Sequence, residues 1–210
     1  MTDMLVMPLL FNNFCGGPVR DDFSDPNSGW PRGDDGVVAV GYVDGQYSIL
    51  HRQADHWIAV TRDERWVNSE QVRVTARLAS GNGLVGMIFG LNDDWSEFYT
   101  MEVAPHYRAY LVRHFTAAEG WETLAIYQSV DGIHTGSEPN VLRIERQWAG
   151  SDQEEVRLIV NNRTMTLPEP LPDTAFNGRV GLTGASFEAN TDIRFEDYMF
   201  VGENCIIPTE

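Results

Sequence analysis

Residues 71–78 read QVRVTARL, and this stretch decides the fold class of the chain. Its apolar residues occupy every second position, at Val72, Val74, Ala76 and Leu78, and polar residues stand between them. Side chains on a β-strand alternate between the two faces of a sheet, so this period of two predicts a strand with one buried and one solvated face. A helix would need its apolar residues three or four positions apart.

The same alternation, or a short apolar run, recurs along most of the chain. We predict strands at residues 37–42, 45–51, 56–61, 71–78, 83–91, 96–104, 107–115, 121–127, 142–145, 156–160, 178–185 and 191–201. Turn-forming pairs such as Asp44-Gly45, Asp131-Gly132 and Asn161-Asn162 separate these segments. Many short strands divided by turns are typical of a sandwich or barrel, so the sequence predicts an all-β fold.

Composition excludes several classes of protein. The chain has 210 residues, of which 42% are hydrophobic and 11% aromatic, so it can bury a core and is not disordered throughout. Its 15 basic residues, all Arg, stand against 31 acidic ones and give a formal charge of −16. Such a charge repels phosphate, so we expect neither nucleic acid nor an anionic membrane surface as a partner. No apolar run reaches the ~20 residues that a membrane span needs, so membrane insertion is not expected.

The strand pattern fits one domain. It runs without a linker or repeat over residues 19–202, which leaves an N-terminal tail at 1–18 and a C-terminal tail at 203–210. Residues 4–14 are apolar, but Pro8 and two asparagines interrupt them, and they lack a basic flank and a small-residue cleavage site. We therefore expect no signal peptide in the chain as given.

The two cysteines, Cys15 and Cys205, bracket almost the whole predicted domain. They are either two independent thiols or one disulfide that ties the ends together. A disulfide requires adjacent termini and an oxidising compartment. No Cys-x-x-Cys motif or Cys/His cluster indicates a zinc site.

Short motifs, in order along the chain, carry a family resemblance. They are DDFSD at 21–25 with SGW at 28–30, DGQYSI at 44–49, GMIF at 86–89 followed by EFYTMEV at 97–103, NVLRI at 140–144 with VN at 160–161, and RFEDY at 194–198. Over residues 19–202 the chain resembles the concanavalin A-like lectin/glucanase superfamily, and within it the bacterial domains called 3-keto-disaccharide hydrolase-like or laminin-G-like. The resemblance implies a two-sheet antiparallel jelly-roll β-sandwich whose first and last strands are adjacent. Adjacent ends would bring Cys15 near Cys205, which favours the disulfide.

The catalytic signature of the retaining glucanases in that superfamily is absent. It places two glutamates and an aspartate on one strand, as E-x-D-x-x-E or E-x-D-x-E, and neither pattern occurs here. Retaining hydrolysis needs two carboxyl groups about 5 Å apart. Glu97 and Glu102 are an odd number of positions apart, so on a regular strand they face opposite sides and cannot be that pair. Standard glucanase chemistry is therefore disfavoured, and we assign no catalytic residue.

Aromatic residues indicate a sugar site instead. Sugar rings stack on exposed Trp and Tyr side chains while polar groups bond the hydroxyls. If Tyr99, Met101 and Val103 face the core, the alternate residues of that strand face outward and line a groove with the next strand. The candidate carbohydrate-binding residues are Trp95, Phe98, Glu102, Arg108, Tyr110 and Trp121. The alternative is that these aromatics only pack a large sandwich.

The resemblance also implies one cofactor, a structural calcium ion. In related lectin-like folds such an ion often lies between the first and last strands. Carried over, its ligands would be Asp22, a backbone carbonyl at Gly45, and Asp197. Hard oxygen ligands suit Ca²⁺. The alternative is that these residues form ordinary solvated turns.

Three hypotheses for function follow. The first is a non-catalytic carbohydrate-binding, lectin-like module that is secreted or held at the cell surface and binds a glycan or polysaccharide. The second is a glycoside hydrolase or related sugar-cleaving enzyme, with Glu97 and Glu102 as its single acid candidates. The third is a laminin-G-like structural or protein-interaction module without a sugar site. The first is our working hypothesis.

Overall fold

The computed structural model describes residues 15–16, 19–148, 154–172, 175 and 178–205. These residues form an antiparallel β-structure of two packed sheets, and a 3-10 turn, η1 (Pro105–Tyr107), connects β8 (Glu97–Ala104) to β9 (Ala109–Thr116). The predicted all-β, two-sheet sandwich is therefore confirmed. None of the described segments forms a helix of the length and apolar character that a membrane span requires.

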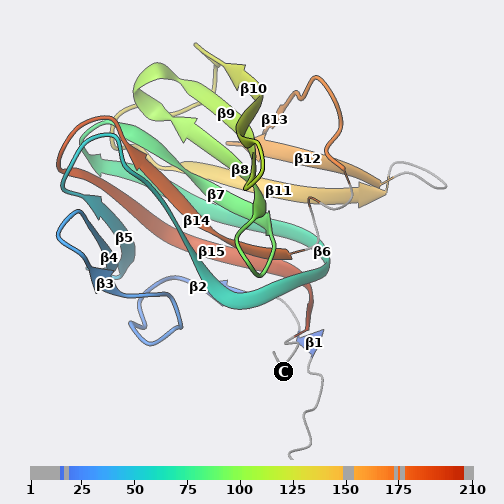
Figure 1. Ribbon diagram of the computed structural model, residues 1–210, viewed down its shortest axis with the longest axis horizontal. Helices are drawn as coiled ribbons and strands as arrows, with labels where there is room; N and C mark the ends of the chain where they lie inside the picture. Colours follow the sequence, from blue (N-terminus) through green and yellow to red (C-terminus); the bar gives the residue numbers. More distant parts are fainter. Residues whose placement is uncertain (1–14, 17–18, 149–153, 173–174, 176–177, 206–210) are drawn as a thin grey trace, which may run out of the picture.

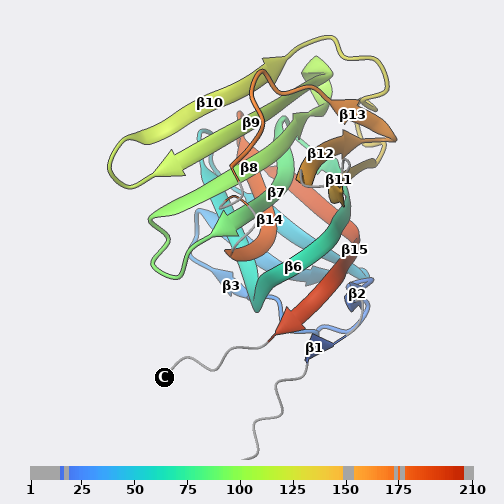
Figure 2. The same cartoon turned by 90° about the vertical axis from the view of Figure 1, so that its right-hand side faces the viewer.

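The first sheet, here called the front sheet, follows the order β10-β9-β8-β7-β14-β6. Figure 2 shows β7 to β10 side by side in one layer. Its strands are β7 (Gly83–Leu91), β8 (Glu97–Ala104), β9 (Ala109–Thr116), β10 (Gly120–Tyr127), β14 (Gly178–Ser186) and the first half of β6 (Trp57–Ser80).

The second sheet, here called the back sheet, is built around the second half of β6 and β15 (Thr191–Cys205). On one side of β6 lie β11 (Asn140–Trp148), β12 (Glu154–Val160) and β13 (Arg163–Met165). Three strands pair directly with β15 along its length, namely β5 (Gln46–His51), β2 (Val19–Asp21) and β1 (Cys15–Gly16). Beyond β5 lie β4 (Val38–Val43) and then β3 (Gly33–Asp34).

Strand β6 belongs to both sheets. Its residues 57–66 pair with β14, and residues 71–76 pair with β11 while the same half also pairs with β15 (Figure 1). The sequence predicts two strands here, at 56–61 and 71–78, and this division is wrong because β6 runs unbroken for 24 residues. Residues 62–70 contain neither Gly nor Pro, so nothing in the chain forces a turn between the two halves.

The core lies between the sheets and consists mainly of apolar and aromatic side chains. In the stretch QVRVTARL, the four apolar side chains are at most 2% exposed, as the period of two predicts. From the front sheet, alternate residues of β7, β8 and β9 meet them, among them Met87, Met101 and Val112, each 0% exposed. Burial of this apolar surface is the main force that holds the two sheets together.

A β-bulge in β15 explains why its inward residues change parity. Ile193 and Phe195 face the core, and so do Tyr198 and Phe200, although the step from 195 to 198 is odd. The pairing with β6 shifts between Phe195 and Asp197, which leaves Glu196 as the extra residue. One extra residue reverses the facing of all that follow it, so both apolar pairs reach the core.

The backbone register places Cys15 directly opposite Cys205, because β1 pairs with the end of β15 (Figure 2). Opposite residues on antiparallel strands have Cα atoms about 4.5–5.5 Å apart, which lies within the span of a disulfide. The disulfide itself stays a prediction. We expect protein purified without reductant and then denatured to take up no iodoacetamide, and two labels after reduction, by intact mass. Two labels without reduction would contradict the disulfide, and Cys15→Ser is the matched control, with one label.

His51 gives the fold a dependence on pH. Its side chain is 0% exposed. Burial, with His56 nearby, lowers the pKa of His51 from 6.5 to about 4. The unfolded chain therefore takes up this proton first, so stability is complete above pH 6.5 and falls as the pH drops toward 4.

We expect this residue to account for a loss of about 2 kcal/mol in the free energy of unfolding between pH 7 and pH 5. Urea unfolding at the two pH values measures it, and His51→Leu should lose that much less than the parent protein. The exposed His106 provides the control, since His106→Gln should retain the parent's pH dependence. An equal pH dependence in His51→Leu would contradict the assignment.

Candidate functional site

The outer face of the front sheet carries the candidate site. On β8, Tyr99, Met101 and Val103 point into the core, as predicted. The alternate residues therefore point outward, and Phe98 joins a separate apolar cluster on that face. Glu102, although on the outer face of the sheet, is 0% exposed.

Glu102 is the polar centre of this face, and donors surround its carboxylate. The indole Nε1 of Trp57 donates to Oε1 at 3.0 Å, and the hydroxyl of Thr100 donates to Oε2 at 3.0 Å. Arg113 donates twice to Oε2, from Nε at 2.9 Å and from Nη2 at 2.5 Å. The partners come from three strands, β6, β8 and β9, so the carboxylate joins them across the sheet. A buried carboxylate needs such partners because desolvation of an unpaired charge is costly.

Gly86 makes the room that Glu102 occupies. It pairs with Glu102 across β7 and β8. A Cβ atom at position 86 would lie 2.3 Å from the Met101 carbonyl oxygen and 2.7 Å from Cγ of Glu102. Any side chain here would therefore displace the strand or the carboxylate, so the glycine is required by close packing.

Four aromatic rings lie beside the ion pair between Glu102 and Arg113. The Trp57 and Phe98 rings stack at 5.6 Å with an interplanar angle of 5°, and Phe98 stacks on Phe115 at 4.8 Å. Trp121 packs edge-on against Trp57 and Phe98, and the Arg113 guanidinium lies 4.2 Å from the centre of a Trp121 ring. Trp121 keeps 42% of its surface exposed. We call these four rings, with Arg113 and Glu102, the aromatic platform.

The structure brings together three of the six predicted sugar-binding residues, namely Phe98, Glu102 and Trp121. Trp95 lies at the same end of the sheet, in the β7–β8 turn, where it is 40% exposed. A bond of 2.7 Å from the Ala117 amide to the Ser96 carbonyl ties this turn to the one that precedes β10. The turn that carries Trp95 thus lies beside the turn that leads to Trp121.

Tyr110 does not lie on this face, and its predicted place beside Glu102 is wrong. It pairs with Val103 across β8 and β9, so it shares the core face of Val103. It is 4% exposed and donates its hydroxyl to the Thr166 carbonyl at 3.1 Å. The residue opposite Glu102 is Leu111 instead. A different register across the hairpin would have reversed these two faces.

Arg108 also departs from its prediction. It is not part of a strand, because it ends η1 in the left-handed conformation at φ 47°, and β9 begins only at Ala109. Its side chain pairs with Asp131 at 2.8 Å near the surface. Its role is to close the turn before β9 rather than to line the platform.

Sequence reasoning put Thr100 on the same face as Phe98 and Glu102 without counting it as a site residue, and it missed Trp57, Arg113 and Phe115. Thr100 follows directly from the alternation on β8, as does Arg113 from the register that pairs it with Thr100. Trp57 comes from β6, which is distant in sequence and reaches Glu102 across β14 and β7. No local pattern indicates that contact.

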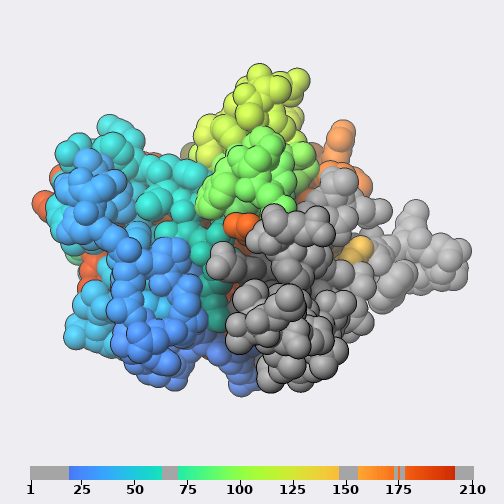
Figure 3. Space-filling model, turned by 60° about the horizontal axis from the view of Figure 1, so that its bottom comes forward, coloured from blue at the N-terminus to red at the C-terminus, as the bar shows by residue number. Residues whose placement is uncertain are grey.

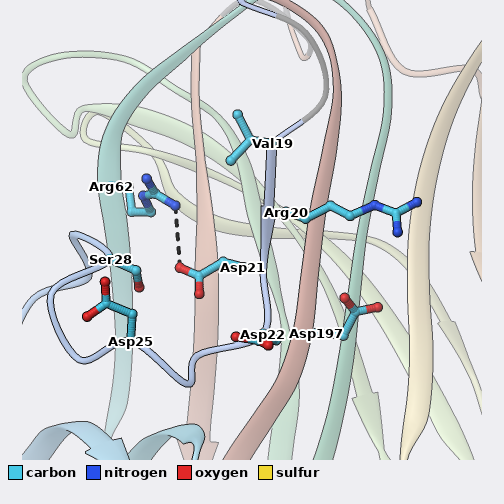
Figure 4. Close-up of a pocket in the computed structure, with 8 residues that line it drawn as sticks. All are labelled: Val19, Arg20, Asp21, Asp22, Asp25, Ser28, Arg62 and Asp197. Atoms are coloured by element: carbon cyan, nitrogen blue, oxygen red, sulfur yellow. Dashed lines mark hydrogen bonds and ion pairs between the residues drawn. The ribbon is translucent and has the colours of Figure 1, made fainter.

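A second, polar pocket lies at the edge of the back sheet and contains two of the predicted calcium ligands. Its volume is about 580 Å³, and Figure 4 shows the side chains that line it. They are Val19, Arg20, Asp21, Asp22, Asp25, Ser28, Arg62 and Asp197. The Asp21 carboxylate already has protein partners, because it accepts hydrogen bonds from the Trp30 indole at 2.9 Å, from the Phe23 amide at 2.8 Å and from Arg62 at 3.4 Å.

The described residues of this pocket do not form a calcium shell as they stand. Asp197 pairs with Arg73, and Asp22 accepts two bonds from Ser24. Gly45, the third predicted ligand, does not line the pocket. Ca²⁺ takes six to eight oxygen ligands, and two guanidinium groups line the space where it would sit. Calcium binding stays a prediction from the resemblance alone.

The carboxylates named for hydrolysis are also separated. Glu97 lies near His114, whose Nε2 is 3.1 Å from its Oε1, and His114 stacks on the core-side Tyr99 at 4.2 Å. Glu102 faces the other way and is sealed by its donors. The two groups therefore do not converge on one substrate, as the odd spacing between them predicts.

Comparison with known proteins bears on the fold. No protein-family model and no curated protein matches this sequence. Solved structures do match. A β-glucanase from Bacillus licheniformis has a TM-score of 0.60 and 11% identity, over 89% of this chain and 98% of that chain. A structure from work on endo-acting O-glycanases of the human gut microbiota that initiate mucin breakdown has a TM-score of 0.61 and 14% identity, over 89% and 99%.

A third match is a Bacillus subtilis protein of unknown function with a galectin-like fold, with a TM-score of 0.59 and 11% identity over 90% of this chain and 97% of that chain. At such identities the likeness concerns the fold. The chain has the two-sheet jelly-roll fold that the resemblance implies, and the comparisons bear on nothing finer than that fold.

The Glu102–Arg113 pair yields a prediction about stability. We expect Glu102→Gln to lower the free energy of unfolding by about 3 kcal/mol, because it leaves a mostly buried Arg113 charge without its partner. The matched control is Asp131→Asn, which breaks an exposed pair with Arg108 and should cost less than about 1 kcal/mol. Chemical denaturation measures both. Equal, small losses would show that the carboxylate does not hold the platform together.

Proposed function

We propose that this protein binds a carbohydrate, without cleaving it, on the outer face of the front sheet. The observation that carries the proposal is the half-exposed Trp121 ring, which rests on three further aromatic rings and lies against the Arg113 guanidinium. An indole held in this way offers an apolar surface beside hydrogen-bond donors, which is the combination that a sugar ring requires.

Arg113 supplies the polar half of the site. It directs Nε and one Nη2 hydrogen at Glu102, and a guanidinium has five N–H donors in all. Because its geometry is fixed by Glu102 and by the Trp121 ring, its remaining donors are oriented before a ligand arrives. Such preorganisation reduces the entropy that binding would otherwise cost.

Hydrolysis is the weaker alternative, although two of the similar structures come from glucanase and glycanase work. Cleavage of a glycosidic bond needs an acid and a second carboxylate around the bond. On the platform, Glu102 is fully buried, and the partners described for it are donors. A carboxylate in this state anchors neighbours and does not reach a glycosidic oxygen. The laminin-G-like interaction module is the third possibility, and failure to bind any glycan would favour it.

The net charge of the chain narrows the class of glycan that we expect it to bind. At −16, the protein repels anionic polysaccharides, so the proposed ligand is a neutral glycan or polysaccharide. Such polymers lie mainly outside the cytoplasm, and the proposed Cys15–Cys205 disulfide would need an oxidising compartment. We therefore propose a secreted or cell-surface location.

Trp121→Ala tests the proposal. Screened against a panel of neutral polysaccharides by affinity electrophoresis, the parent protein should be retarded by at least one, and the variant should bind about tenfold more weakly or not at all. Tyr127→Ala is the matched control, because Tyr127 is 39% exposed on the same strand but stacks on Tyr110 away from the platform. Retardation that survives in Trp121→Ala would place the site elsewhere.

A further inference from the structure

A small apolar pocket adjoins the aromatic platform on the same face. Its volume is about 220 Å³. It is lined by Leu84, Ala104, Tyr107, Ala109, Leu111, Ile126, Gln128 and Phe187. Leu111 lies opposite Glu102, and Ala104 follows Glu102 on the same face of β8, so the pocket begins where the platform ends. The Trp57 side chain packs against the apolar clusters of both.

Two small side chains and the 3-10 turn η1 form this pocket. Its floor contains two alanines, Ala104 and Ala109, which pair directly across β8 and β9 and are each 3% exposed. Small side chains at both positions leave a hollow that larger ones would fill. One wall is Tyr107 of η1, whose hydroxyl accepts from the Asn82 amide at 3.3 Å and whose carbonyl accepts from Ser129. The pocket is therefore held open by the fold.

The exposed apolar residues of the protein concentrate here. Of seven large hydrophobic side chains that are clearly exposed among the described residues, three line this pocket and a fourth is Trp121. The three are Tyr107, Ile126 and Phe187, exposed by 55%, 54% and 43%. Exposed apolar surface gathered in one place marks a binding site, whereas single exposed residues need no explanation.

Resting on the proposed function, we propose that the site takes a neutral glycoside carrying an apolar substituent. The sugar lies on Trp121 beside Arg113, and a short alkyl or aryl group of the same molecule enters the apolar pocket. A pocket lined almost wholly by carbon cannot bond sugar hydroxyls, so a second bare sugar ring does not suit it. An apolar cavity of about 150 Å³ accepts benzene, so 220 Å³ is enough for a group of about six carbons.

A second copy of the chain is a poor occupant for this face. Each copy carries a formal charge of −16, so two copies repel one another at close approach. The pocket is also too small to receive a protein surface of the size that stable dimers bury. A compact, uncharged group is neither repelled by the charge of the protein nor too large for the pocket.

Matched glycosides test the inference. Hexyl and methyl β-D-glucopyranoside, and the same pair of β-D-galactopyranosides, are titrated by calorimetry below the concentration at which micelles form. For at least one sugar, the hexyl glycoside should bind at least about tenfold more tightly than the methyl glycoside, because its chain leaves water. Ile126→Asn and Phe187→Asn should reduce this advantage to less than about threefold, and Val43→Asn, an exposed apolar position on β4, should not.

The outcomes separate this inference from the proposed function. Equal affinity of the hexyl and methyl glycosides, with both lost in Trp121→Ala, overturns the inference and leaves sugar binding intact. Binding of 1-hexanol as tight as that of the hexyl glycoside, and unchanged in Trp121→Ala, overturns the combined site, because the sugar then contributes nothing. Binding of neither glycoside overturns the inference, while the polysaccharide panel decides the proposed function independently.

Discussion

The rest of the structure depends on the continuity of β6. This one strand forms the edge of the front sheet through its first half and the centre of the back sheet through its second half. The two sheets are thus joined by backbone hydrogen bonds as well as by the apolar core. Trp57, at the start of the strand, reaches the Glu102 carboxylate on the front sheet's outer face, while Val72 and Val74, farther along, close the core. The site and the core are therefore positioned by the same strand. On the face drawn in Figure 3, teal residues lie between the blue N-terminal residues and the projecting yellow-green ones.

The outer face of the front sheet combines a buried carboxylate with exposed aromatic rings, and each depends on the other for its position. Glu102 can be desolvated only because Trp57, Thr100 and Arg113 donate to it. Those donors in turn hold the Trp57 indole and the Arg113 guanidinium at fixed angles, on which Phe98 and Trp121 then pack. The carboxylate that a search for catalytic acids would select is, in this protein, what orders the aromatic surface.

The sequence predicts the strands well and the faces of the site only in part. Alternation and turn residues locate every described strand of six residues or more, because they are local properties of the chain, and they miss the short strands β1, β2, β3 and β13. The parity of β8 follows from the same rule, and so Phe98 and Glu102 are correctly placed outward. The facing of β9 depends on how many residues η1 and Arg108 take up between the strands, and a single residue decides between Tyr110 and Leu111 as the partner of Glu102. Contacts such as Trp57 to Glu102 span distant parts of the sequence and leave no local trace.

Most of the proposed binding face rests on regular strands, while its borders are turns. The platform is supported by β6, β8, β9 and β10, but Trp95 and Tyr107 stand on short irregular segments, and Phe187 follows the end of β14. Turns tolerate substitution and insertion far better than paired strands do. Substitutions at the rim should therefore cost less folding stability than substitutions at the centre of this face, so the rim is where a proposed ligand preference could change without rebuilding the surface beneath it.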